Sequence, residues 1–199
     1  MPVRGACLAI ALPFLPLLAE GQANVRIGGG PGLPLGALSD DTKAVGPSFL
    51  AGVAIPVDIG YFLLIEGHHS RFGIGEEALP RPNDGVVSDA EKRLTGGNVG
   101  LLIEGVADPV GFYGHGGVGW ARGTRGTGGT GKTGRSIEGE GARTGKDDHS
   151  FLFVIGLGVN VFINDNLGLT LNVRYNHVRD MFDGRAQWVP VTVSAVIRL

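Results

Sequence analysis

The sequence predicts an all-β protein, an eight-stranded antiparallel up-and-down transmembrane β-barrel, and two observations carry that prediction. Residues 166–179 alternate apolar and polar side chains with a period of two, and the same period returns in residues 187–199. Such alternation is typical of a strand with one apolar face and one polar face. An export signal precedes these segments, and long strands of this kind in an exported chain favour a closed barrel in a membrane.

The export signal occupies the amino terminus. Arg4 gives a positive start, residues 5–19 are almost wholly apolar, and residues 21–23 place small side chains at the positions that a signal peptidase reads. The apolar run is too short to span a bilayer as a helix, so a retained anchor is the weaker alternative. We therefore expect a signal peptide over residues 1–23 and one outer-membrane barrel domain over residues 24–199.

Composition limits the chemistry of the chain. Its formal net charge is −2, which argues against nucleic acid as a partner because phosphate binding needs a concentrated basic surface. The single cysteine, Cys7, lies in the predicted signal peptide, so the mature protein would have neither a disulfide nor a reactive thiol. Nothing in the sequence predicts a cofactor.

Eight strands follow in order from the period-two segments and the turn residues between them. The predicted strands span residues 24–33, 47–57, 60–73, 93–107, 110–122, 149–163, 166–180 and 187–199. Tight-turn residues stand near 58–60, 108–109 and 164–166, whereas the connections 34–46, 74–92, 123–148 and 181–186 are longer. This alternation of short turns and long loops is the asymmetry of outer-membrane barrels, with both chain ends on the periplasmic side.

The faces that would meet lipid carry no charge. Aromatic residues such as Tyr61, Phe112 and Trp120 stand near strand ends, where interfacial girdles are found. The alternative is a soluble exported sandwich or a lipocalin-like barrel, in which the apolar faces would enclose a core. The predicted lipid face includes Phe49, Ala51, Val53, Ile55, Leu63, Ile65, Val99, Leu101, Ile103, Phe151, Phe153, Ile155, Leu157, Val159 and Val161.

A family resemblance rests on residues 156–175, GLGVNVFINDNLGLTLNVRY, which a short loop and a final strand follow. This segment resembles the closing hairpin of the OmpA-like and OmpX-like eight-stranded outer-membrane barrels. The resemblance implies a monomer in the bacterial outer membrane, with outer-membrane lipid, lipopolysaccharide and the outer-membrane assembly machinery as its partners. The family usually ends in an aromatic residue, whereas this chain ends in Leu199.

Strand parity places charged residues inside the barrel. Eight-stranded barrels are narrow enough for side chains to fill them, and isolated buried charges are costly, so the acids and bases should pair. The plain interpretation is a polar plug that holds the barrel together, and a gated conduction path is the alternative. The predicted lumen network comprises Arg26, Glu66, Glu104, Arg174 and Arg198, with Asn98, His115 and Asn172 on the same face.

Two motifs suggest chemistry without supporting it. Glu66, His68 and Ser70 share one strand face and weakly resemble the His-x-Ser pair of lipid A deacylase barrels, but residues two apart on a strand are poorly placed for direct contact. A metal site at His68 and His69 is disfavoured because neighbouring strand residues point to opposite faces. Residues 126–133, GTGGTGKT, match a phosphate-loop formula but lack the helix that such a loop requires.

The predicted function is therefore a structural or surface-interaction barrel, not an enzyme, with a plugged lumen and external loops that carry any recognition. A narrow, porin-like solute channel is the first alternative, and a lipid A-modifying enzyme is the second. The loop over residues 123–148 mixes bases with acids, which suits either plain solvation or contact with anionic lipopolysaccharide.

Overall fold

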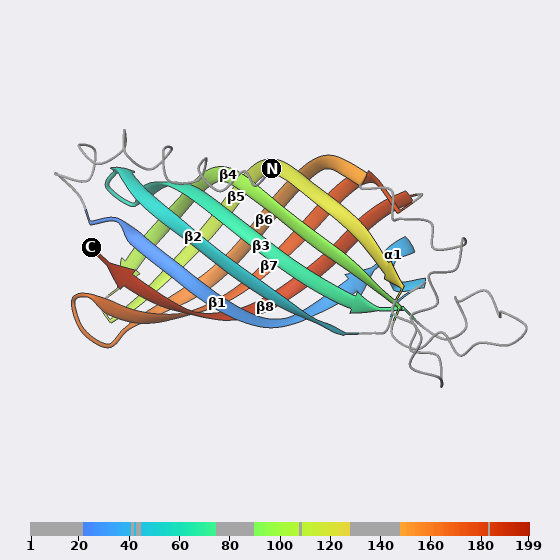
Figure 1. Ribbon diagram of the computed structural model, residues 1–199. Coiled ribbons are helices and arrows are strands. Elements are labelled where there is room, and N and C mark those ends of the chain that lie inside the picture. The colour runs from blue at the N-terminus through green and yellow to red at the C-terminus, as the bar shows by residue number, and fades with distance from the viewer. Residues whose placement is uncertain are drawn as a thin grey trace, which may run out of the picture.

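The computed structural model describes residues 22–40, 42, 45–74, 90–107, 109–127, 148–182 and 184–199. Within them, eight strands form one closed barrel in which each strand pairs antiparallel with the next and β8 pairs with β1 (Figure 1). The predicted fold is thus confirmed. The elements are β1 (Asn24–Leu35), α1 (Ala37–Asp40), β2 (Gly46–Asp58), β3 (Tyr61–Gly73), β4 (Ala90–Ala107), β5 (Val110–Thr127), β6 (Asp148–Phe162), β7 (Leu167–Met181) and β8 (Gly184–Arg198).

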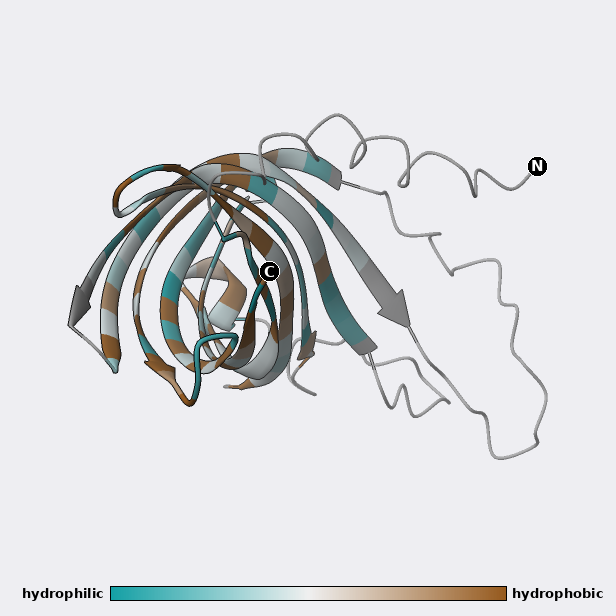
Figure 2. Cartoon of the chain, turned by 90° about the vertical axis from the view of Figure 1, so that its left-hand side faces the viewer, coloured by the Kyte–Doolittle hydropathy of each residue, from teal (hydrophilic) through white to brown (hydrophobic). Residues whose placement is uncertain are grey.

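The alternation of side chains sets the two faces of the barrel wall. On β7, Leu171 is 51% exposed whereas its neighbour Thr170 is 2% exposed. Hydrophobic and hydrophilic segments alternate along the strands in the same way (Figure 2). Most residues of the predicted lipid face are exposed or half-exposed, and Ile55 is the exception because it is buried. The outer surface is consequently a broad apolar band that needs a nonaqueous surrounding.

The short connections gather at one rim, which we call the turn rim. The side chain of Asn164 accepts hydrogen bonds from the backbone nitrogens of Asn166 (3.0 Å) and Leu167 (2.8 Å), which is the chemistry of a tight Asx turn. At the β2–β3 turn, Gly60 has a φ of 74°, a conformation that glycine adopts without strain. Both ends of the barrel also meet at this rim, since Leu199 donates its backbone N–H to the carbonyl of Ala23.

The opposite rim, which we call the loop rim, carries the connections between β1 and β2, β3 and β4, β5 and β6, and β7 and β8. The last of these corrects a prediction. Residues 181–186 were expected to form a longer loop, but Met181 pairs directly with Gly184 and closes a tight hairpin. Asp180 and Phe182 adopt positive φ values of 57° and 55° there, and neither residue is a glycine that would have marked the turn.

Two further differences from the sequence prediction also lie near the loop rim. Strand β5 continues to Thr127 because its glycine-rich end still pairs through its backbone with β4, where Thr127 is the partner of Ala90. The predicted connection 34–46 contains a short helix, α1, which begins after Gly36 and contacts β8. No helix within the described ranges is long and apolar enough to cross a membrane.

Two predictions concern residues outside the described ranges. The signal peptide expected over residues 1–23 lies almost wholly there, and so does most of the phosphate-loop-like segment 126–133.

Candidate functional site

The candidate site is the lumen, whose centre is crossed by an ion pair. Nη1 of Arg174 lies 3.3 Å from Oε2 of Glu66, and Nη2 donates a hydrogen bond of 3.4 Å to Oε1. Both side chains are only 1% exposed. They come from β7 and β3, which are four strands apart in a ring of eight and therefore face each other. The pair thus links opposite walls of the barrel.

A second contact also crosses the lumen. The guanidinium carbon of Arg26 on β1 lies 4.5 Å from the ring centroid of Tyr113 on β5, in a cation–π arrangement. Both side chains are buried. Glycines on β6 give room for such large groups, because a Cβ at Gly158 would come within 2.5 Å of the Tyr113 hydroxyl and one at Gly156 within 2.4 Å of His115. Glycine is thus used here to accommodate bulky lumen side chains.

The second acid, Glu104, has an amide as its hydrogen-bond partner. Asn160 donates from Nδ2 to Oε1 of Glu104 over 2.5 Å and accepts a hydrogen bond from the hydroxyl of Thr170. Arg198, which the sequence placed in the same network, is only half-buried. It lies at the turn-rim end of β8 with its guanidinium 3.3 Å from the ring centroid of Phe162.

The structure therefore separates the five predicted lumen residues. Glu66 and Arg174 meet at the centre, Arg26 contacts Tyr113, Glu104 binds Asn160, and Arg198 stays at the rim. Parity gave the face on which each side chain lies, but parity carries no information on height along the barrel. That is why the sequence grouped residues that lie apart.

Many polar lumen atoms have no hydrogen-bond partner among the described residues. No partner contacts either ring nitrogen of His68, and the same holds for the amide nitrogen and oxygen of Asn98 and of Asn176, although all three side chains are buried. Buried polar groups in proteins are normally satisfied by protein or by water. The middle of the lumen is thus polar enough for water to enter.

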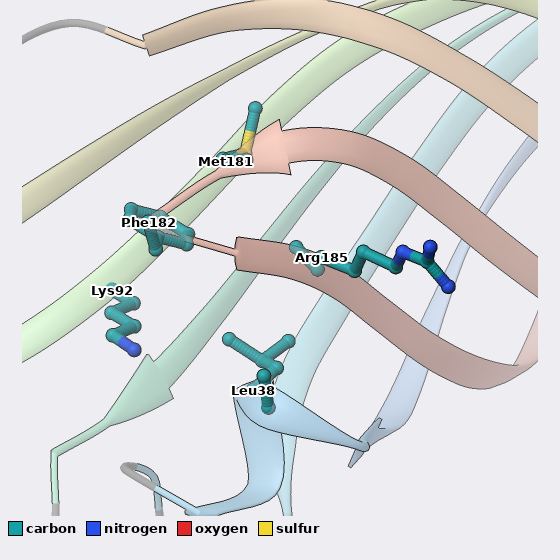
Figure 3. A pocket seen from close by; sticks show the side chains of 7 residues that line it. Leu38, Lys92, Met181, Phe182 and Arg185 are labelled. Atoms are coloured by element: carbon teal, nitrogen blue, oxygen red, sulfur yellow. The ribbon is translucent and has the colours of Figure 1, made fainter.

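Towards the loop rim the lumen becomes apolar. Ten buried residues pack together there, drawn from α1 and every strand from β3 to β8, and we call them the mouth cluster. Leu38 rises from α1 toward the hairpin that carries Met181 and Phe182 (Figure 3). The mouth cluster comprises Leu38, Phe72, Leu94, Ala121, Leu152, Val154, Val178, Met181, Ala186 and Trp188.

The sequence prediction did not include this apolar cluster. Its lumen list held only polar residues, although apolar residues such as Phe72, Leu94 and Val178 occupy the same inward parity near the loop rim. Apolar residues at inward positions near the loop rim could therefore have indicated the cluster. No sequence pattern indicated that Leu38 is buried, because its helix lies in a connection that was expected to have no regular structure. Lys92 is also buried beside the cluster, with its ammonium 5.1 Å from the ring centroid of Phe182.

His68 and Ser70, which suggested nucleophilic chemistry, lie on the same inward face but contact different partners. The hydroxyl of Ser70 lies 2.8 Å from that of Ser48, and the ring of His68 packs against Trp188 at a centroid distance of 5.8 Å. His69 lies on the outer face, so the two adjacent histidines do not converge. In the described part of the chain, no three His, Cys, Asp or Glu side chains come together in a way that could hold a metal ion.

Comparison with solved structures gives the same barrel. Neisserial surface protein A aligns with a TM-score of 0.62 at 14% identity, covering 90% of this chain and 100% of that one. The N-terminal β-barrel domain of Pseudomonas aeruginosa OprF (TM-score 0.52, 10% identity) covers 90% of this chain and 100% of its own. OprG from the same organism (0.52, 12%) covers 90% and 96%. Comparison with curated protein sequences found no match.

The family comparison is decisive for classification. The model of the outer membrane protein beta-barrel domain matches residues 5–194, nearly the whole chain. The predicted likeness to eight-stranded outer-membrane barrels and the predicted location are thereby confirmed. The chain belongs to the outer membrane protein beta-barrel domain family and is a β-barrel of the bacterial outer membrane.

Proposed function

We propose that the protein is a structural and surface-interaction barrel whose lumen is closed at the loop rim. The observation that carries this proposal is the mouth cluster, in which Leu38 of α1 and Trp188 of β8 are both buried. Close-packed apolar side chains leave little room for water and make a path costly for ions. The closure is built partly from a loop element, so it belongs to the external side of the barrel.

The lumen ion pair supports the structural part of the proposal. Glu66 and Arg174 connect two opposite strands, and a buried pair is strongly destabilised when one partner is removed. Arg26 with Tyr113 adds a second contact across the lumen. The interior thus works as a set of cross-links inside a narrow frame, in keeping with the small diameter of an eight-stranded barrel.

The surface-interaction part of the proposal rests on the lengths of the connections between strands. Residues 75–89 and 128–147 connect strands at the loop rim, whereas the turn rim uses only a few residues for each connection. Recognition in rigid scaffolds is carried mostly by loops. The proposed orientation places the loop rim outside the cell, with a signal peptide over residues 1–23 removed during export, a monomeric barrel, and the assembly machinery and outer-membrane lipid as partners.

Conductance in planar bilayers tests the closed lumen. We expect no steady unitary currents from the wild type, and currents from the double variant Leu38→Ala with Trp188→Ala, because those changes remove the largest side chain of the mouth cluster and the one that α1 contributes. The matched control is Trp120→Ala, which removes the same side chain from the outer face, where Trp120 is 70% exposed. Steady wild-type currents would instead support the narrow channel, which the polar middle of the lumen also favours.

The lipid A-modifying alternative has a separate test. Ser70 is buried and contacts Ser48, so nothing in its surroundings presents it to a lipid substrate. Mass spectrometry of lipid A from cells with and without the protein should give identical species. A difference that disappears in Ser70→Ala would replace the structural proposal with an enzymatic one.

A further inference from the structure

One arginine of the lumen has no acidic partner. Arg26 on β1 is only 2% exposed, and its guanidinium lies over the ring of Tyr113. Among the described residues, no carboxylate lies within ion-pair distance of it. A buried charge without a counter-charge is costly, and a guanidinium cannot lose its proton to avoid that cost. Arg26 is therefore the place in the lumen where a bound anion would be most stabilising.

The two lumen acids are engaged with other residues. Glu66 pairs with Arg174 over 3.3 Å, and Glu104 accepts a hydrogen bond of 2.5 Å from the amide of Asn160. With the half-buried Arg198 included, the described inward side chains between the turn rim and the mouth cluster carry three guanidinium groups and two carboxylates. One monovalent anion would balance these charges.

The unpaired edge of Arg26 has the shape that two oxygens require. Nε and Nη2 are both buried, and neither has a hydrogen-bond partner among the described residues. The two nitrogens are bonded to the same carbon, and their N–H bonds run parallel along one edge of the planar group. The cation–π contact with Tyr113 supplies no acceptor for either N–H. This edge therefore matches a planar oxyanion better than a spherical halide.

Other unpaired polar groups lie near Arg26. The hydroxyl of Tyr113 is buried without a partner among the described residues, and so are both ring nitrogens of His115, whose ring centroid is 6.0 Å from that of Tyr113. The hydroxyl of Ser194 is in the same condition. It lies over Gly28, which is two residues from Arg26 on the same face of β1, because a Cβ on that glycine would overlap it. These groups would donate further hydrogen bonds to an anion on Arg26.

Apolar side chains border the polar middle of the lumen on its turn-rim side. Ala54, Leu64, Leu102 and Tyr113 form a buried cluster on β2 to β5, with Phe62 packed against it. The mouth cluster borders the polar middle on the opposite side. Hydrogen bonds and charges interact more strongly in such surroundings than in water. An anion on Arg26 would therefore be weakly screened and firmly held.

We propose that the lumen binds one small planar oxyanion, of the carboxylate or nitrate class, on the Nε–Nη2 edge of Arg26, with the hydroxyls of Tyr113 and Ser194 as further donors. The anion must be small because side chains fill the lumen of an eight-stranded barrel. The inference goes beyond the proposed function. It depends neither on what the external loops recognise nor on whether the mouth is closed.

The test measures binding of radiolabelled formate to the purified full-length protein by equilibrium dialysis. The protein is refolded in detergent with formate present, so that entry into the lumen does not limit the result. We expect one formate per barrel in the wild type and an affinity about 10-fold lower in Arg26→Gln. The matched control is Arg198→Gln, which removes the same charge from an arginine that also contacts an aromatic ring but is half-buried at the turn rim. Its affinity should stay within about 2-fold of the wild type.

A second variant separates charge from shape. Arg26→Lys keeps a cation near the ring of Tyr113 but removes the two-pronged edge, so the affinity for formate should fall about 5-fold. Nitrate should displace formate from the wild type more effectively than chloride does at equal concentration.

Three results would overturn the proposal. They are the absence of saturable formate binding to the wild type, wild-type affinity in both Arg26 variants, and equal displacement by chloride and nitrate. The first would indicate that water alone fills the surroundings of Arg26, and the last would indicate a site for charge without the two-oxygen match. Heat-modifiable gel mobility reports whether each variant is folded. Arg26→Lys retains the buried charge, so it keeps the test decisive if Arg26→Gln does not fold.

Discussion

The middle of the lumen and its mouth are built from the same strands and the same inward parity, yet they are held together by different physics. Along β3 the inward residues run from Leu64 through Glu66, His68 and Ser70 to Phe72, passing from apolar to polar and back to apolar. The middle depends on charge pairing and hydrogen bonds, whereas the mouth depends on close packing. Alternation in the sequence thus specifies which side chains point into the lumen. Their height along the strand determines whether they pair as polar groups or pack as apolar ones.

The largest expected effect comes from removing the ion pair in the middle of the lumen. Arg174→Ala leaves the Glu66 carboxylate buried without its ion-pair partner, which should lower the free energy of unfolding by about 3 to 5 kcal/mol. The double variant Arg174→Ala with Glu66→Ala should recover part of that loss, because no charge is then stranded. Denaturant unfolding of the detergent-refolded barrel measures both.

The control for this prediction is Arg179→Ala. Its partner Asp180 is 86% exposed, and an exposed ion pair contributes little. An Arg174→Ala variant as stable as the Arg179→Ala control would mean that solvent reaches Glu66 freely. Buried charge pairing would then no longer distinguish the middle of the lumen from its mouth.

A slightly smaller effect is expected at the mouth. Leu152 is completely buried in the mouth cluster, so Leu152→Ala should cost about 2 to 5 kcal/mol through the lost contacts and the cavity left behind. The volume-conserving change Leu152→Ile should cost less than about 1.5 kcal/mol. Unfolding in low and high salt separates the regions further, since the loss at Leu152 should not depend on salt. Equal losses for the two substitutions would contradict a packed mouth.

The smallest effect is expected on the turn-rim side of the lumen. Asn160→Ala removes the donor to Glu104 and the acceptor for Thr170, and a lost hydrogen bond to a buried charged group costs about 1 to 3 kcal/mol. Because the mouth cluster is untouched, single-channel recordings of this variant should stay silent. Currents from Asn160→Ala would show that the lumen is closed near the turn rim and not at the mouth.

The sequence predicts the barrel well because strands and tight turns are specified by residues close together in the chain. Alternation around Leu171 gives the strand and its faces, and Asn164 marks a tight turn. The choice of Arg174 as the partner of Glu66 was not predicted, because Arg26 has the same parity and parity does not give the height of each side chain along the barrel. The hairpin at Phe182 was missed for a related reason, since its positive φ is imposed by strand pairing and not by a glycine.

The measurement that tests the closed mouth most directly is labelling of a cysteine placed beneath it. Residues 24–199 contain no cysteine, so Thr192→Cys introduces a single thiol on β8, in the polar middle and four residues from Trp188. A membrane-impermeant maleimide added to intact cells should leave this thiol unmodified, while it labels Ser39→Cys on the exposed side of α1. Adding Leu38→Ala and Trp188→Ala to Thr192→Cys should make the thiol reactive. Labelling of Thr192→Cys with the mouth cluster intact, at the rate seen for Ser39→Cys, would contradict the closed mouth.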